Sequence, residues 1–176
     1  MNVIYPTDTA NQIHCVATVG IFDGVHVGHR FLIDQVIASA KAQNLQSVVV
    51  TFAKHPRSIL SEDFHPAQLA TTGIDTCIVL EFTEKMAELS AHDFLKSILK
   101  DLFKVHILFV WHDHRFGHDR LEGFHEYQQY GESMGMKVIQ AKRYSTAEFE
   151  HICSSEIRLE IQRGNFHSAN ALLSYN

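Results

Sequence analysis

The chain has 176 residues, of which 45% are hydrophobic and 20% charged, so it can bury an ordinary globular core without disulfides or a structural metal. Its formal net charge is −5, from 15 basic and 20 acidic residues, and it carries no basic block, which excludes a nucleic-acid-binding groove. It has no membrane-spanning run of ~20 apolar residues and no signal-peptide pattern at its amino terminus. We therefore expect one domain over residues 1–176, located in the cytoplasm.

The cysteine pattern also indicates a reducing compartment. Cys15, Cys77 and Cys153 are an odd number, lie far apart, and form no C-x-x-C pair. Secreted disulfide frameworks and zinc sites use paired cysteines at short spacing, so we expect three reduced thiols.

Apolar runs of strand length alternate with helical patterns along the chain. This alternation predicts a parallel sheet with helices on both faces, that is, a doubly wound, Rossmann-like α/β fold with about five strands. A loop-rich stretch separates the second strand from the third. The predicted strands are 15–19, 47–52, 76–82, 106–111 and 137–141. The predicted helices are 29–44, 123–135, 154–163 and 166–173. A further helix is predicted to begin after an N-cap at Ser90 and to continue to Leu102.

The most informative stretch follows the first predicted strand. Residues 19–29 read Val-Gly-Ile-Phe-Asp-Gly-Val-His-Val-Gly-His. His26 and His29 are three residues apart, so they lie on one face of a starting helical turn, where imidazole and backbone N–H groups can meet an anion together. Gly20, Gly24 and Gly28 permit the close backbone approach that a phosphate needs. Glycines and paired histidines rarely combine in a merely structural turn, so we interpret residues 20–29, the histidine loop, as a phosphate-binding segment.

Three further polar segments follow other predicted strands. The carboxyl ends of parallel strands meet at one edge of a sheet, and ligands bind there. We therefore expect these segments to join the histidine loop in one site. They are His55-Pro56-Arg57 after strand 47–52, Asp113 to Arg120 after strand 106–111, and Ser154, Ser155 and Arg158 beyond the last strand.

These segments resemble a known family. The F-D-G-V-H-x-G-H pattern is similar to the HxGH nucleotidyltransferases, most of all to the FMN adenylyltransferase module of bacterial bifunctional FAD synthetases. Residues 51–57 resemble the T-F-x-x-H-P-R segment of that module, residues 113–117 its D-F-R-F-G, and residues 152–158 its I-S-S-T/S-R-I-R. Four motifs in order cover most of the chain, so the resemblance implies a shared fold, and the motif residues, rather than the fold, imply a shared chemistry.

The chemistry that the resemblance implies is adenylyl transfer. A phosphate oxygen of FMN attacks the α-phosphorus of ATP and pyrophosphate leaves, without a protein nucleophile. His26 and His29 would be the catalytic residues, because they neutralise the charge that develops on the phosphates. Mg²⁺ would bridge phosphate oxygens with few protein ligands, and no metal site built from the chain itself is expected.

The resemblance also implies binding roles. Ser154 and Ser155, at a helix N-terminus, and Arg158 would hold the outer phosphates. The ATP-binding residues would be Gly20, Phe22, Asp23, Gly24, Gly28, Ser154, Ser155 and Arg158, and the flavin side of the site would be formed by His55, Pro56, Arg57, Asp113, Arg115, Phe116 and Gly117.

The sequence departs from the family at several positions. Glu156 stands where the family carries arginine, which would weaken polyphosphate binding if its side chain faces the ligand. The helix that the family inserts between Leu69 and Gly73 is missing, and we expect no riboflavin kinase domain after Asn176. The other departures are Ala53 at a commonly acidic position, Trp111-His112 in place of a Gly-aromatic pair, and Cys153 in place of serine.

Alternatives remain open on the sequence alone. The chain is an FMN adenylyltransferase, another HxGH nucleotidyltransferase for a small phosphorylated substrate, or a nucleotide- or flavin-binding pseudoenzyme. Locally, residues 154–158 could be an ordinary capped helix and residues 55–57 a fixed turn. The spacing of His112, His114 and His118 with Asp113 and Asp119 matches no zinc pattern, which favours solvated loop histidines. The acceptor substrate and the oligomeric state are not indicated.

Overall fold

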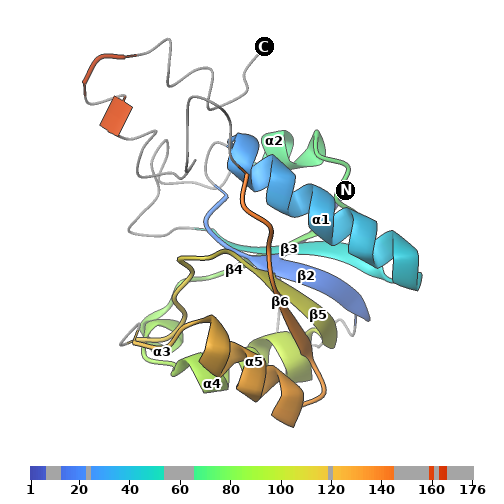
Figure 1. Ribbon diagram of the computed structural model, residues 1–176, viewed down its shortest axis with the longest axis vertical. Coiled ribbons are helices and arrows are strands. Elements are labelled where there is room, and N and C mark those ends of the chain that lie inside the picture. Colours follow the sequence, from blue (N-terminus) through green and yellow to red (C-terminus); the bar gives the residue numbers. More distant parts are fainter. Residues whose placement is uncertain are drawn as a thin grey trace.

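The computed structural model describes residues 1–6, 13–22, 25–53, 66–118, 121–144, 159–160 and 163–165 (Figure 1). Its strands are β1 (Asn2–Ile4), β2 (Cys15–Val19), β3 (Gln46–Phe52), β4 (Thr76–Leu80), β5 (Val105–Val110) and β6 (Lys137–Gln140). Its helices are α1 (Val27–Gln43), α2 (Pro66–Ala70), α3 (Glu84–Ala87), α4 (Ala91–Asp93), the π-helix η1 (Phe94–Leu102) and α5 (Phe124–Ser133).

The strands form one parallel sheet in the order β1-β4-β3-β2-β5-β6. The predicted parallel α/β fold is confirmed, but the sheet has six strands rather than about five, because β1 adds an edge strand. From β2 the chain steps outward through β3 to β4 and then crosses back to β5 on the other side of β2. The strand order therefore reverses between β2 and β5, and their carboxyl ends flank the crevice in which such folds bind ligands.

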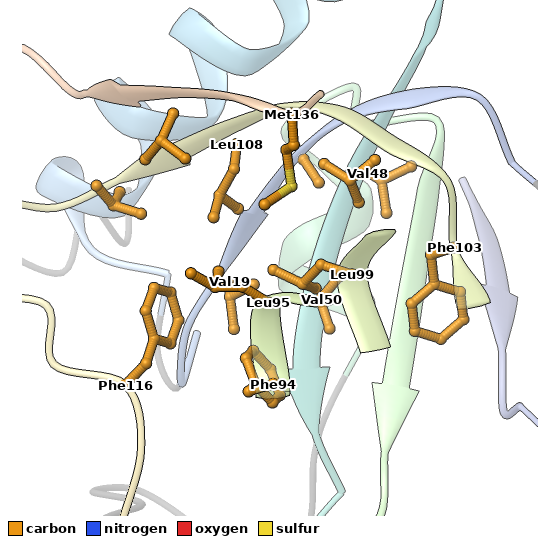
Figure 2. Close-up of a cluster of buried hydrophobic side chains, with 14 of the residues drawn as sticks. Val19, Val48, Val50, Phe94, Leu95, Leu99, Phe103, Leu108, Phe116 and Met136 are labelled. Carbon is orange, nitrogen blue, oxygen red and sulfur yellow. The ribbon is translucent and has the colours of Figure 1, made fainter. Parts of the chain in front are cut away.

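Helices cover both faces of the sheet. Figure 1 shows α1 and α2 on one side and α3, α4 and α5 on the other. Alternate residues of each strand point to opposite faces, so the apolar side chains form two core clusters. One cluster packs under α1 and includes Val16, Leu32 and Val36. Figure 2 shows the other cluster, in which sheet residues meet η1 and the loop after β5; its labelled members are Val19, Val48, Val50, Phe94, Leu95, Leu99, Phe103, Leu108, Phe116 and Met136.

Several predicted boundaries need correction. Helix α1 begins at Val27 instead of residue 29, because His26 caps it. Strand β4 ends at Leu80 instead of residue 82. The Ser90 cap is confirmed, since Ser90 Oγ accepts the Asp93 N–H at 3.0 Å, but the helix that follows changes after Asp93 from α-helical to π-helical hydrogen bonding.

Short elements were missed by the sequence analysis. Helices α2 and α3 have five and four residues, fewer than a periodic pattern needs to stand out. After α2 the chain turns through Gly73, at φ +82°, into β4. The predicted helices 154–163 and 166–173 lie almost entirely outside the described residues. Of the helices that the described residues form, none combines the length and the apolar character that crossing a bilayer requires.

Candidate functional site

The histidine loop leaves the carboxyl end of β2 at Gly20. The Gly20 N–H donates to the Val50 carbonyl of β3 at 3.0 Å, so the loop starts in register with the sheet. A Cβ atom on Gly20 would lie 3.2 Å from the buried Phe22 ring, so a larger residue there would have to displace this ring slightly. The Phe22 ring in turn lies 4.9 Å from the His29 ring, measured between centroids. The structure thus makes Phe22 a core support for His29.

The two histidines of the loop are stacked. Their ring centroids are 3.6 Å apart and their planes differ by 21°. They therefore lie on one face of the starting helical turn, as the spacing of three residues predicted. His26 is the N-cap of α1, and its Nδ1 accepts the backbone N–H of His29 at 3.2 Å. Val25, directly before the cap, has φ +33°, a conformation that strains a β-branched residue and that proteins tend to retain at functional sites.

Burial keeps both imidazoles neutral. It lowers the pKa of His26 from 6.5 to about 4. The pKa of His29 is also lowered, first by burial and then by repulsion from a charged His26. At pH 7 the pair therefore presents N–H donors rather than positive charges, and a bound anion would raise both pKa values.

Unsatisfied polar atoms gather at the junction of β2 and α1. His29 Nδ1, Arg30 Nε and Thr18 Oγ1 are buried and have no hydrogen-bond partner among the described residues. Thr18 is fully buried and lies on the α1 face of β2, because it alternates with Val19, which faces the other cluster. Arg30 is positioned by a 2.7 Å hydrogen bond from its Nη2 to Thr71 Oγ1. Buried polar groups without a partner indicate a site that a ligand or water completes.

Thr18 and Arg30 did not enter the predicted site. Thr18 carried a usable signal, since it is the polar residue in the otherwise apolar strand that precedes the loop. Arg30 carried none, because its placement depends on a residue 41 positions away.

The loop after β5 is anchored on η1 and α5. The Phe116 ring is buried and packs 5.5 Å from Phe94 and 4.9 Å from Tyr127, measured between centroids. The Phe116 N–H donates to the Tyr127 hydroxyl at 2.8 Å, and that hydroxyl donates to the Glu122 carbonyl at 2.8 Å. We therefore assign the Phe116 ring to holding the loop in place.

Gly117 anchors the same loop. It has φ +80°, and a Cβ atom on it would lie 2.7 Å from the Ala91 backbone nitrogen. Asp113 and Arg115 are exposed, and Arg115 Nη1 donates to the His114 carbonyl at 3.0 Å. These two side chains remain the candidates of this loop for contact with a ligand.

The loop histidines differ from one another. His118 is exposed, as expected for a solvated residue. His114 is partly buried: its ring lies 4.3 Å from the Phe116 ring, and burial lowers its pKa to about 4. His114 is therefore less exposed than a solvated loop histidine, because its ring packs on the aromatic core of the loop.

The structure brings together only part of the predicted site. The histidine loop and the loop after β5 leave neighbouring strands at the same edge of the sheet. Gly28 is buried in the first turn of α1. Outside the described residues lie Asp23, Gly24, His55, Pro56, Arg57, Ser154, Ser155 and Arg158, together with Cys153 and Glu156.

Neither metal coordination nor thiol chemistry is indicated where the chain is described. Within those residues, no group of three His, Cys, Asp or Glu side chains converges as a metal site requires. Cys15 and Cys77 are free and buried, and burial raises the pKa of each thiol to about 12. Both thiols therefore stay protonated and act as core residues.

Comparisons with known proteins agree with the geometry. The bifunctional riboflavin kinase/FMN adenylyltransferase of Pseudomonas fluorescens is 33% identical over 170 residues, which are 90% of this chain and 54% of that protein. The protein of the same name from Escherichia coli strain K12 is 29% identical over 98% of this chain and 58% of its own length. This chain thus spans about half the length of the curated relatives that it matches.

A solved structure shares the fold. The crystal structure of a protein described as a macrolide-efflux protein from Streptococcus pneumoniae superposes with a TM-score of 0.77 at 25% identity. The superposition covers 97% of this chain and 68% of the other. The family model for FAD synthetase matches residues 8–156, which include the histidine loop and the loop after β5. The chain belongs to the FAD synthetase family.

Proposed function

We propose that this chain transfers the adenylyl group of ATP to FMN and produces FAD and pyrophosphate. An oxygen of the FMN phosphate attacks the α-phosphorus of ATP, the bond from that phosphorus to the bridging oxygen breaks, and pyrophosphate leaves with the electron pair. The observation that carries the proposal is the stacked, neutral His26–His29 pair at the N-terminus of α1, beside the strand-order reversal, in a member of the FAD synthetase family.

The phosphates of ATP would lie at the first turn of α1. The first backbone N–H groups of a helix have no partner within the helix, so those of Val27 and Gly28 can meet an anion. Gly28 has no side chain, so it adds no steric barrier between this turn and a phosphate.

The two imidazoles would supply directed N–H donors. Because His26 Nδ1 accepts a hydrogen bond, a neutral His26 carries its proton on Nε2. His29 Nδ1 is buried without a partner among the described residues, so it still has hydrogen-bonding capacity to offer a phosphate. Ring stacking and the cap hydrogen bond fix both imidazoles beforehand, and such fixed donors stabilise the charge that grows on the α-phosphate and the leaving pyrophosphate.

The remaining contacts are assigned from the motifs. Asp23 and Gly24 complete the ATP side of the histidine loop, and the outer phosphates would meet Ser154, Ser155 and Arg158. On the flavin side we place Asp113 and Arg115, with His55, Pro56 and Arg57 from the segment after β3. Mg²⁺ would accompany ATP, bind through phosphate oxygens and neutralise part of their charge.

The location is part of the proposal. Cys15 and Cys77 are free thiols that lie too deep in the core for ready oxidation. Unpaired core cysteines fit a reducing compartment, which supports the cytoplasm.

The test is a direct assay. The protein is mixed with ATP, Mg²⁺ and FMN, FAD is measured by chromatography, and pyrophosphate is measured in parallel. We expect the unmodified chain to form FAD and pyrophosphate in equal amounts. The control His118→Ala removes an exposed imidazole from the loop after β5 and should form both products at the same rate as the unmodified chain. His29→Ala should form both products far more slowly. Turnover with another small phosphorylated acceptor instead of FMN would assign the chain a different nucleotidyltransferase reaction, and ATP binding without any turnover would make it a nucleotide-binding protein.

A further inference from the structure

The single tryptophan of the chain, Trp111, directly follows β5. Its indole is half-buried and packs against the α1-side core cluster, to which Phe22 and Val25 of the histidine loop also belong. Figure 1 shows that β5 lies beside β2, the strand from which that loop departs. Trp111 thus stands at the carboxyl edge of the sheet where the strand order reverses.

The pairing register of β2 and β5 indicates which residue of the histidine loop lies beside Trp111. Thr18 of β2 pairs with Phe109 of β5. Continuing this register by two residues along both strands brings Trp111 beside Gly20, and alternation puts both residues on the α1 face, as it does Thr18. The Phe22 ring lies close to Gly20 and also packs on His29. The indole therefore packs against the same apolar cluster as the aromatic support of the histidine pair.

We infer that Trp111 is the surface on which the adenine ring of the bound ATP stacks. This inference rests on the function proposed above. The histidine loop offers N–H donors for phosphates, whereas a flat heteroaromatic base needs a flat apolar partner. Phe22 and Phe116, the phenylalanines of the two loops at this crevice, are buried and present no free ring face, while Trp111 keeps part of its indole accessible.

Fluorescence of the unmodified protein tests the inference directly, because Trp111 is the only tryptophan. Binding is measured in parallel by calorimetry, which does not depend on the indole. Three compounds are compared in the presence of Mg²⁺: ATP, inorganic tripolyphosphate, which has phosphates but no base, and FMN. We expect ATP to quench the Trp111 emission and tripolyphosphate to displace ATP without quenching.

The outcomes separate the inference from the proposed function. Heat of ATP binding without any change in Trp111 emission would overturn the stacking role and leave the nucleotide site standing. Equal quenching by tripolyphosphate would also overturn it, because a movement of the loop would then explain the signal. No binding heat at millimolar ATP would overturn both.

Substitution gives a second measurement. Trp111→Leu keeps apolar bulk but removes the aromatic face, so ATP should bind about tenfold more weakly, in line with the loss of one base–aromatic stack, while tripolyphosphate affinity stays the same. Trp111→Phe, which keeps an aromatic face, should lose less ATP affinity than Trp111→Leu. Phe82→Leu is the matched control, since it removes a partly exposed aromatic ring, just after β4, that pairs with Phe52 at the end of β3, and it should leave ATP affinity unchanged. Weaker binding of FMN rather than ATP to Trp111→Leu would overturn the adenine assignment. If Trp111→Leu does not fold, the fluorescence of the unmodified chain still decides.

Discussion

The Nδ1 atom of His26 accepts the backbone N–H of His29 at 3.2 Å while the two rings stack at 3.6 Å. One side chain thus caps helix α1 and also orients the second imidazole of the site. The stability of the helix start and the geometry of the site are therefore coupled through His26.

Substitutions at His26 should separate these two roles. His26→Ala removes the cap acceptor and should lower the free energy of unfolding by about 1 kcal/mol, whereas His26→Asn supplies an amide oxygen and should restore most of it. Both variants lose the Nε2 donor, so both should form FAD far more slowly than the unmodified chain. Urea unfolding and the FAD assay check the two effects. If His26→Asn recovers activity along with stability, His26 acts as a cap alone.

His29 should matter more for turnover than for folding. Its Nδ1 makes no hydrogen bond to a described residue, so His29→Ala breaks no internal hydrogen bond of that atom. Removing one preorganised donor from a transition state typically slows turnover by about a hundredfold or more. Steady-state rates of FAD formation, with circular dichroism as the check on folding, measure both quantities. Turnover equal to that of the unmodified chain would exclude His29 from the mechanism.

Two glycines with nearly the same positive φ offer a matched pair. Gly117 and Gly73 have φ of +80° and +82°, but a Cβ atom would lie 2.7 Å from Ala91 N at Gly117, whereas it would meet nothing within 4 Å at Gly73. Gly73→Ala should therefore lower the free energy of unfolding by only about 1 kcal/mol, the cost of placing an alanine at positive φ. Gly117→Ala should lower the free energy of unfolding by clearly more, and it should also shift the loop that carries Asp113 and Arg115. Thermal unfolding compares the two, and equal losses would show that the loop yields without strain.

Some elements were predictable because their pattern is local. Strand β2 matched its predicted bounds, since five buried residues precede a glycine. The histidine pair was predictable from its spacing alone. Strand β1, by contrast, has three residues, none of them fully buried, and exists because β4 pairs with it. Nothing in so short a segment distinguishes an edge strand from a loop.

Other features could not be predicted, because they use an unusual residue or depend on partners far away in the chain. The start of α1 was misplaced because histidine is not among the usual N-cap residues, so the helix was predicted to begin three residues after its actual cap. The π-helical form of η1 arises where Phe94, Leu95 and Leu99 are buried against the sheet, although the same apolar spacing is typical of an α-helix. The partial burial of His114 follows from the way Tyr127 and Gly117 hold its loop.

Acid should destabilise the folded chain through its buried imidazoles. An unfolded histidine takes up a proton near pH 6.5, whereas folded His26 does so only near pH 4. Between these values the unfolded state binds more protons, so stability falls as the pH drops from 6.5 and levels off below 4. The full effect of His26 is about 3 kcal/mol at most. Urea unfolding at pH 7 and pH 5 should show a smaller loss for His26→Gln than for the unmodified chain, and an identical loss would mean that His26 is charged in the folded state.

Binding of ATP should reverse this titration. Phosphates placed beside His26 and His29 favour the charged imidazoles and raise both pKa values, so binding takes up protons and becomes tighter as the pH falls toward about 4, the pKa of His26 in the free protein. Calorimetry in buffers of different ionisation enthalpy measures the uptake, and a binding measurement with Mg²⁺ and a non-hydrolysable ATP analogue keeps turnover out of the result. The double variant with His26→Gln and His29→Gln should lose the uptake, whereas His118→Ala, which changes an exposed residue, should keep it. If proton uptake persists in the double variant, the protons bind to the nucleotide or elsewhere in the chain. The phosphates of ATP would then not lie beside the histidine pair.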